Sequence, residues 1–154
     1  MRRANEQIYL EKKGKGQGRH YHPWLDLIRS QPFIEMYPIL KRGQYEQDLY
    51  GPFQDEMIEI FGVNHVHPQL AIAYGTTLKI DFHIGLASGA GVGIELKMPN
   101  SNSELQRAIG QIDQYRDKYG NNLVMVLLAD FMKEAEKQLF LNAAKARGVE
   151  ILER

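Results

Sequence analysis

The stretch 77-TLKIDFHIGLASGAGVGIELKMP-99 decides how this chain folds. It holds two runs, Leu78–Leu86 and Val92–Met98, whose apolar and β-branched residues predict strands. Between them, Ser88–Gly91 is rich in glycine and predicts the turn of a hairpin. Pro99 ends the second run, because proline has no N–H group to give to a strand ladder. We therefore expect two neighbouring antiparallel strands.

Both predicted strands carry charge where a buried strand normally has none. Asp81 lies in the first strand, and Glu95 and Lys97 lie in the second. Because side chains alternate along a strand, Glu95 and Lys97 share one face, and the hairpin lets the carboxylate of Asp81 converge with that of Glu95. Charges in a sheet covered on both faces are costly unless they have partners or bind a metal, and proteins keep them mainly for chemistry. The alternative is an edge strand that shows its two charges to water.

The remaining sequence predicts three helices and three further strands. Apolar residues at helical spacing indicate helices at Gly43–Phe61, Ser103–Tyr119 and Phe131–Arg147. Apolar runs indicate strands at Val63–Ala73, Leu123–Ala129 and Val149–Leu152. The order α-β-β-β-α-β-α-β predicts an α/β fold, with a central mixed sheet flanked by helices.

Local signals set the expected ends of these elements. Ser103, with Gln106 three residues later, predicts a capping box at the start of a helix, and Gly120 predicts its end. Pro68 makes the Val63–Ala73 strand an edge strand or an irregular one. Pro52 is compatible with the Gly43–Phe61 helix only as a kink or as the first residue of a second segment.

Composition limits the class of protein. The 154 residues fit one domain, and 19 basic side chains balance 19 acidic ones, so no overall charge draws the chain to nucleic acid or membrane. Residues 1–22 predict a flexible, basic N-terminal arm, and residues 23–154 a single domain. The absence of cysteine excludes disulfides and a cysteine nucleophile. Without an apolar leader or a run of about 18 apolar residues, we expect a cytoplasmic protein that does not enter the membrane.

The converging acids suit one kind of chemistry. Two carboxylates, from Asp81 and Glu95, with a backbone carbonyl would suit a hard cation such as Mg²⁺. On the same face, the ammonium group of Lys97 could orient a water molecule and offset the charge that develops on a phosphate. This combination is typical of phosphodiester hydrolysis.

These motifs resemble those of a known family. Asp81, then Glu95–Lys97, then Gln111–Tyr115 is similar to the pattern of the PD-(D/E)xK nuclease superfamily, which has the restriction-endonuclease-like αβββαβ core. The Gln-x-x-x-Tyr element resembles that of the RecB-like branch. The acid-x-Lys tripeptide also occurs at Glu11–Lys13, so the order of elements over residues 43–130 is the more specific part of the resemblance. The family's Pro-Asp is Ile80-Asp81 here, a substitution that the superfamily often tolerates.

The resemblance implies a role for each matching residue. Asp81, Glu95 and the carbonyl of Leu96 would hold Mg²⁺ or Mn²⁺, and Lys97 would be the catalytic lysine. Gln111 and Tyr115 would line the site and contact the nucleic-acid backbone. Many members add a glutamate from the first helix, for which Glu46 is the first choice and Glu56 the second.

Other polar residues are weaker candidates. At helical spacing Gln111 aligns with Arg107, Gln114 and Lys118, a ridge that would suit phosphate contacts or be an ordinary solvated face. His65 and His67 could bind a metal, although an exposed edge is the simpler interpretation. His83 could reach the acids or be a buried histidine with satisfied hydrogen bonds.

The sequence therefore predicts a Mg²⁺-dependent deoxyribonuclease that acts as an enzyme on DNA, with RNA and a homodimer or partner protein left open. Endonuclease and exonuclease action are both compatible with it. Two alternatives remain. One is an inactive nuclease-fold module that binds nucleic acid, and the other is a small-ligand-binding α/β protein in which these charges form a structural ion-pair network.

Overall fold

The computed structural model describes residues 46–72, 77–89, 91–99, 101–128 and 132–153. The predicted arm and the first residues of the predicted Gly43–Phe61 helix lie outside these ranges. The elements follow in the order η1 (Glu46–Leu49, a 3₁₀ helix), α4 (Tyr50–Phe61), η2 (Val63–His65), β1 (Val66–Ala71), β2 (Lys79–Ile84), β3 (Val92–Lys97), α5 (Asn102–Tyr119), β4 (Leu123–Leu127), α6 (Glu134–Ala146) and β5 (Glu150–Glu153). The predicted order of helices and strands is confirmed.

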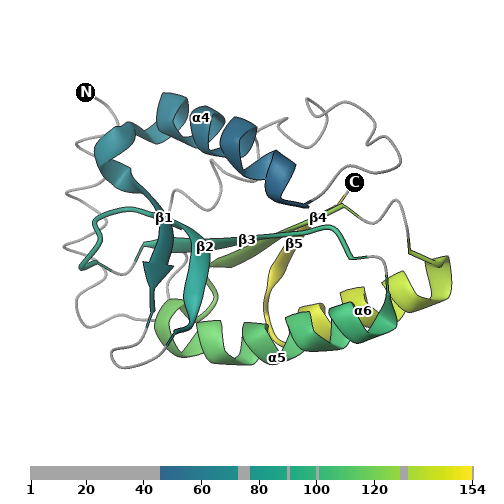
Figure 1. The fold of residues 1–154 in the computed structure, drawn as a ribbon. Coiled ribbons are helices and arrows are strands. Elements are labelled where there is room, and N and C mark those ends of the chain that lie inside the picture. The colour runs from purple at the N-terminus through teal and green to yellow at the C-terminus, as the bar shows by residue number, and fades with distance from the viewer. Residues whose placement is uncertain (1–45, 73–76, 90, 100, 129–131, 154) are drawn as a thin grey trace.

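The strands form one five-stranded mixed sheet in the order β1-β2-β3-β4-β5. The pairs β1–β2 and β2–β3 are antiparallel, whereas the pairs β3–β4 and β4–β5 are parallel. α4 covers one face of the sheet, and α5 and α6 cover the other (Figure 1). The prediction of an α/β protein with a mixed sheet between helices is thus confirmed.

Each face of the sheet has its own apolar core. Beneath α4, the helix side chains Phe53 and Met57 pack on alternate residues of the central strands, among them Ile94 and Val124. On the opposite face, α5 and α6 pack on the intervening strand residues, such as Met125. β3 and β4 are therefore covered on both sides, so a charge on β3 is a buried charge.

The hairpin of β2 and β3 has the predicted antiparallel pairing, with slightly shorter strands than the sequence indicated. At the edge of the sheet, β1 contains Pro68, as expected of an edge strand. Pro52 is the third residue of α4, in the first turn, where an N–H group has no partner within the helix. The change from the 3₁₀ turn η1 to α4 lies just before it, between Leu49 and Tyr50.

The predicted start of α5 was wrong by two residues. Ser101, not Ser103, caps the helix, because its extended backbone lets its hydroxyl accept the N–H of Glu104 at 3.3 Å. Ser103 lies inside the first turn. The predicted end is confirmed, since Gly120 follows the helix with φ of 56° and donates its N–H to the carbonyl of Arg116.

Candidate functional site

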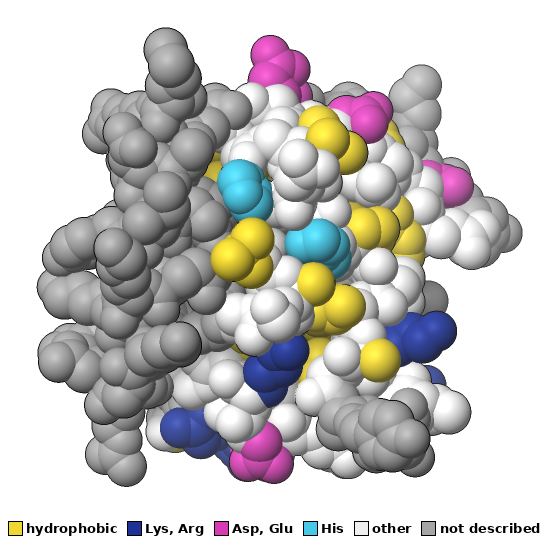
Figure 2. Space-filling view, turned by 90° about the vertical axis from the view of Figure 1, so that its left-hand side faces the viewer, with side chains coloured by type: hydrophobic (Ala, Val, Ile, Leu, Met, Phe, Trp, Pro, Cys, Tyr) yellow, Lys and Arg dark blue, Asp and Glu magenta, His cyan; other side chains and the backbone are white. Residues whose placement is uncertain are grey.

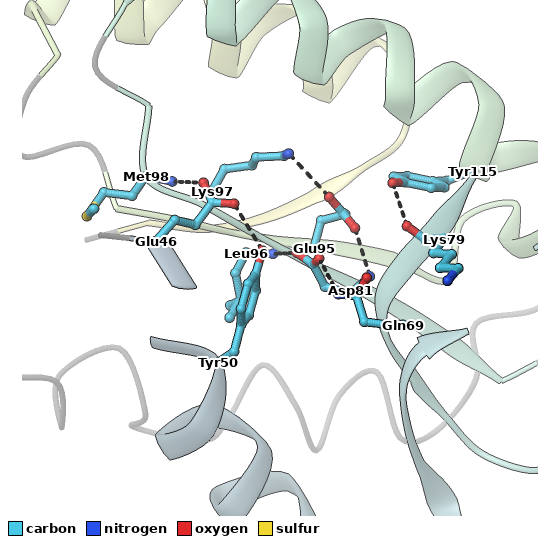
Figure 3. Close-up of polar contacts among 10 residues, drawn as sticks. All are labelled: Glu46, Tyr50, Gln69, Lys79, Asp81, Glu95, Leu96, Lys97, Met98 and Tyr115. Carbon is cyan, nitrogen blue, oxygen red and sulfur yellow. Dashed lines mark hydrogen bonds and ion pairs between the residues drawn. The ribbon is translucent and has the colours of Figure 1, made fainter. Parts of the chain in front are cut away.

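The sheet divides at the two acids. Backbone pairing between β2 and β3 ends at Phe82 with Ile94, while β2 continues beside β1, and β3 beside β4, to the ends of both strands. We call this opening the fork. Asp81 on β2 and Glu95 on β3 are the first residues beyond the last pair, and we call these two strand segments the arms of the fork. The fork brings together the two carboxylates that the hairpin was predicted to bring together (Figure 3).

β2 also twists at the fork, so that its side chains change from one face of the sheet to the other. Phe82 packs in the core beneath α4, but Ile80 packs in the core beneath α5 and α6. Residues two apart on a regular strand face the same side. The strand therefore twists between them, and this twist carries the Asp81 side chain into the opening between the strands.

The carboxylates take the hydrogen bonds that the opened ladder leaves free. The N–H of Asp81 donates to Oε1 of Glu95 at 2.9 Å, and the N–H of Leu96 donates to Oδ2 of Asp81 at 2.8 Å. Each acid thus accepts a backbone N–H from the opposite arm. Leu96 enters the site through this N–H, and the metal-binding role of its carbonyl stays a prediction.

Burial opposes the charge of both acids. Asp81 is 7% exposed and Glu95 is 3% exposed. Burial, and next the charge of Asp81, raise the pKa of Glu95 to about 8. Burial likewise raises the pKa of Asp81, against the opposing effects of the Leu96 N–H and of Lys97. Two neighbouring acids whose pKa values are raised attract a proton or a cation.

Lys97 provides the nearby positive charge. Its Nζ lies 3.5 Å from Oε2 of Glu95, and its side chain is 22% exposed, so the ammonium group lies between the buried pair and solvent. The predicted sharing of one face by Glu95 and Lys97 agrees with this ion pair. Among the described residues, Lys97 is the one basic side chain that forms an ion pair with either acid.

Glu46 reaches the site from η1, which leads into α4 on the face of the sheet that α4 covers (Figure 1). Its Oε2 accepts the N–H of Met98 at 3.0 Å, and its Oε1 accepts the hydroxyl of Tyr50 at 3.1 Å. η1 therefore holds a carboxylate at the end of β3, one residue beyond Lys97. Glu56, the second choice from the sequence, is half-buried on α4 and has no described contact with the fork.

A pocket of about 210 Å³ opens beside Lys97. Its walls come from the end of β3, from η1 and from the first half of α5, and it is lined by Glu46, Lys97, Pro99, Glu104, Leu105, Arg107, Ala108 and Gln111. Oε1 of Gln111 is buried there without a hydrogen-bond partner among the described residues. Of the predicted polar ridge, Arg107 and Gln111 line the pocket, whereas Gln114 and Lys118 do not.

Tyr115 lies on the buried side of α5, and its hydroxyl donates to the carbonyl of Lys79 at 3.0 Å. Burial, and next the charge of Glu95, raise the pKa of Tyr115. This contact fixes the first residue of β2, two residues before Asp81. Tyr115 therefore supports one arm of the fork.

Sequence reasoning missed two residues of the site. Tyr50 follows Glu46 by four residues, a helical spacing that would have indicated their contact. Gln69 on β1 donates its amide to Oδ1 of Asp81 at 3.3 Å. Nothing in the local sequence indicates Gln69, because its place depends on the pairing of β1 with β2.

The contacts described for His65, His67 and His83 are with groups other than the two acids. On the side of the molecule where β1 lies, histidine side chains appear among apolar ones (Figure 2). Nδ1 of His65 is 2.8 Å from the carbonyl of Phe61. His83 is fully buried, and both of its ring nitrogens have partners, as one of the two sequence interpretations held. The ring of His67 lies 5.9 Å from that of His83.

The chemistry of the fork fits a hard divalent cation. Within the described ranges, no group of three or more histidine, cysteine, aspartate or glutamate side chains is arranged to hold a metal ion. Mg²⁺, however, is commonly held by only one or two carboxylates, with water and substrate phosphate as its other ligands. Asp81 and Glu95 supply two such carboxylates with raised pKa values. Asp81 and Glu95 are therefore the residues that could hold such an ion.

Comparisons with known proteins add no relative. No protein-family model matches the chain, and no curated protein or solved structure matches it significantly. None of the described helices has the length and apolar character needed to cross a bilayer. Any functional conclusion must therefore come from the residues of the fork and the pocket.

Proposed function

We propose that this protein is a metal-dependent nuclease that hydrolyses DNA phosphodiester bonds, with a restriction-endonuclease-like fold of the PD-(D/E)xK type. The fork is the observation that carries the proposal. Asp81 and Glu95 are buried side by side where two strands separate, and the ammonium group of Lys97 lies 3.5 Å from Glu95 at the solvent side. An acid pair with one adjacent lysine at a break in a sheet suits phosphoryl chemistry better than it suits stability.

Asp81 and Glu95 would hold Mg²⁺ or Mn²⁺. When bound, such a cation activates a phosphate as a Lewis acid and lowers the pKa of the attacking water. The two carboxylates bind it in their charged forms, so binding displaces any proton held by the pair. The carbonyl of Leu96 is the third proposed ligand.

Lys97 and Glu46 would act at the open side of the fork. The ammonium group of Lys97 would stabilise the negative charge that grows on the phosphate as water attacks phosphorus and the bond to the leaving oxygen breaks. Glu46 is held by Tyr50 and by the Met98 N–H, so its carboxylate would orient water near Lys97.

The pocket beside Lys97 would receive the DNA backbone. Arg107 and Gln111 line it from α5 and would contact a phosphate or sugar next to the scissile bond. Tyr115 would act indirectly, because its hydroxyl is bound to the Lys79 carbonyl and holds the strand that carries Asp81.

One observation favours a second candidate function. The carboxylates already accept the backbone N–H groups of Asp81 and Leu96, so the acids also close the opened ladder. In a small-ligand-binding α/β protein these contacts and the ion pair with Lys97 would be structural. That candidate predicts no affinity for Mn²⁺ at the fork and no cleavage.

A cleavage panel tests the proposal. Linear, circular, single-stranded and branched DNA, and a matching RNA, would be incubated with Mg²⁺ or Mn²⁺, because cutting of circles separates endonuclease from exonuclease action. We expect Lys97→Ala to lower the cleavage rate by about 10²- to 10³-fold, since an electrostatic contact in the transition state is lost. Lys145→Ala, an equal loss of charge on the exposed side of α6, should cut as wild type does. A wild type that cuts nothing, or a Lys97→Ala variant that cuts equally well, would contradict the proposal.

A further inference from the structure

Gln69 has an unusual backbone conformation. Its φ is 53°, and it is the only residue other than glycine with positive φ among the described residues. It lies in β1 between Pro68, which pairs with Phe82, and Leu70, which pairs with Ile80, but Gln69 itself forms no pair with β2. The edge strand is thus interrupted at the one residue that lies opposite Asp81.

The side chain of Gln69 reaches that same aspartate. Its Nε2 donates to Oδ1 of Asp81 at 3.3 Å, while the N–H of Leu96 donates to Oδ2 at 2.8 Å. The carboxylate is therefore held from both sides, by β1 through one oxygen and by β3 through the other. Two hydrogen bonds to different oxygens fix the plane of a carboxylate as well as its position.

The conformation and the contact are best explained together. A positive φ is unfavourable for glutamine, and glycine, asparagine or aspartate would adopt it more readily. Such strain persists where the surrounding structure requires it, often beside functional groups. Asparagine would keep the backbone but is shorter by one methylene, and glycine has no side chain. Of these residues, only glutamine could carry an amide as far as Oδ1 of Asp81.

We propose that Gln69 is a positioning residue that sets the orientation of the Asp81 carboxylate for binding a divalent cation. The inference rests on the proposed function, because it assigns Asp81 to a metal. A ligand that is held by a second hydrogen bond loses less freedom when the ion binds. Gln69 itself is not proposed to touch the ion or the substrate.

Two substitutions separate the side chain from the backbone. Gln69→Gly and Gln69→Asn both tolerate the left-handed conformation, and neither reaches Asp81. We expect Mn²⁺ affinity, measured by titration calorimetry without DNA, to fall about tenfold or more in both. The melting temperature without metal should be equal to or above that of wild type, because the backbone strain is relieved. Ala71→Gly, which removes an exposed side chain from the same strand, should keep wild-type affinity.

The outcomes distinguish this inference from the proposed function. If wild type binds Mn²⁺ and both Gln69 variants bind it within twofold as well, Gln69 has no positioning role and the nuclease proposal stands. If wild type binds no Mn²⁺, both proposals fail. If the variants lose affinity only together with a large fall in melting temperature, Gln69 is structural and the inference is overturned.

Discussion

The two ends of the β2–β3 pair bury polar groups in opposite ways. At the closed end, where the backbones of β2 and β3 pair, His83 lies opposite Gly93. At the forked end, Asp81 and Glu95 both lie beyond the last backbone pair. All three polar side chains are buried. The closed end satisfies its polar group as a neutral one, whereas the fork holds two groups whose charged forms oppose each other.

The contacts of His83 define its protonation. Nε2 lies 2.7 Å from the carbonyl of Leu86, which can only accept, so Nε2 carries the proton. Nδ1, 2.7 Å from the hydroxyl of Tyr119, then accepts from that hydroxyl. Burial lowers the pKa of His83 to about 4, in agreement with a neutral ring. Both ring nitrogens of His83 therefore have a partner.

The comparison teaches that burial alone does not indicate a functional site. Burial favours the neutral form of both groups, because it lowers the pKa of His83 and raises the pKa of Glu95. His83 is then fully paired, but Glu95 lies beside a second acid, Asp81, and among the described residues one lysine, Lys97, forms an ion pair with either acid. The presence of a second acid beside the first, and not burial of a polar atom alone, separates the fork from the closed end.

The largest expected effect comes from making the fork neutral. Glu95→Gln keeps the shape of the side chain and the acceptor for the Asp81 N–H, but removes a proposed metal ligand. We expect cleavage to fall by about 10³-fold, near 4 kcal/mol of transition-state stabilisation, measured in single-turnover assays.

The same variant has an opposite effect on stability without metal. A raised pKa means that Glu95 favours folding when protonated, so this contribution is present at low pH and is lost as pH rises from its ordinary value of 4.5 toward about 8. Glu95→Gln has no such loss, and at pH 9 its melting temperature should exceed that of wild type by on the order of 5 °C. A variant that is both inactive and less stable at pH 9 would contradict the comparison.

Much of the fold was predictable because its signals are local. The glycine-rich turn at Ser88–Gly91 between two apolar runs predicted a hairpin, and Pro99 predicted the end of its second strand. The start of α5, in contrast, could not be predicted from local sequence alone. Ser101 and Ser103 each have Glu or Gln three residues later, and only the path of the chain from β3 into the helix decides which of them caps it.

The candidate site likewise has one contact that the sequence predicted and one that it did not. The convergence of Asp81 with Glu95 follows from strand alternation and one hairpin, so sequence sufficed. The contact of Gln69 with Asp81 requires the register of a second strand pair and a positive φ in glutamine. No sequence pattern predicts such a conformation, because propensity favours other residues there.

A smaller effect is expected from crowding the closed end. A Cβ added at Gly93 would lie 2.7 Å from Cδ2 of Tyr119, too close for van der Waals contact, so the ring must move and its hydrogen bond with His83 must weaken. We expect Gly93→Ala to lower the free energy of unfolding by about 1–3 kcal/mol in urea titrations. Because the fork is untouched, Mn²⁺ affinity should stay within about twofold of wild type.

Gly110 provides the matched control for this substitution. An added Cβ there meets nothing within 4 Å, and the residue lies inside α5. Gly110→Ala should therefore raise stability by about 0.5–1 kcal/mol, through reduced freedom of the unfolded chain. If Gly93→Ala were as stable as wild type, the closed end would be less tightly packed than its contacts indicate.

The last expected effect is the pH dependence of metal binding, which shows whether Glu95 carries a proton before the ion binds. With the pKa of Glu95 at about 8, a proton competes with the ion at neutral pH. The dissociation constant for Mn²⁺ should rise about tenfold for each unit that pH falls below 8, as expected for release of one proton on binding. Calorimetry in two buffers of different ionisation enthalpy counts that proton directly. Glu95→Gln should bind weakly with little dependence on pH between 6 and 8, and a wild type whose affinity is equally flat would mean that Glu95 is already charged before the ion arrives.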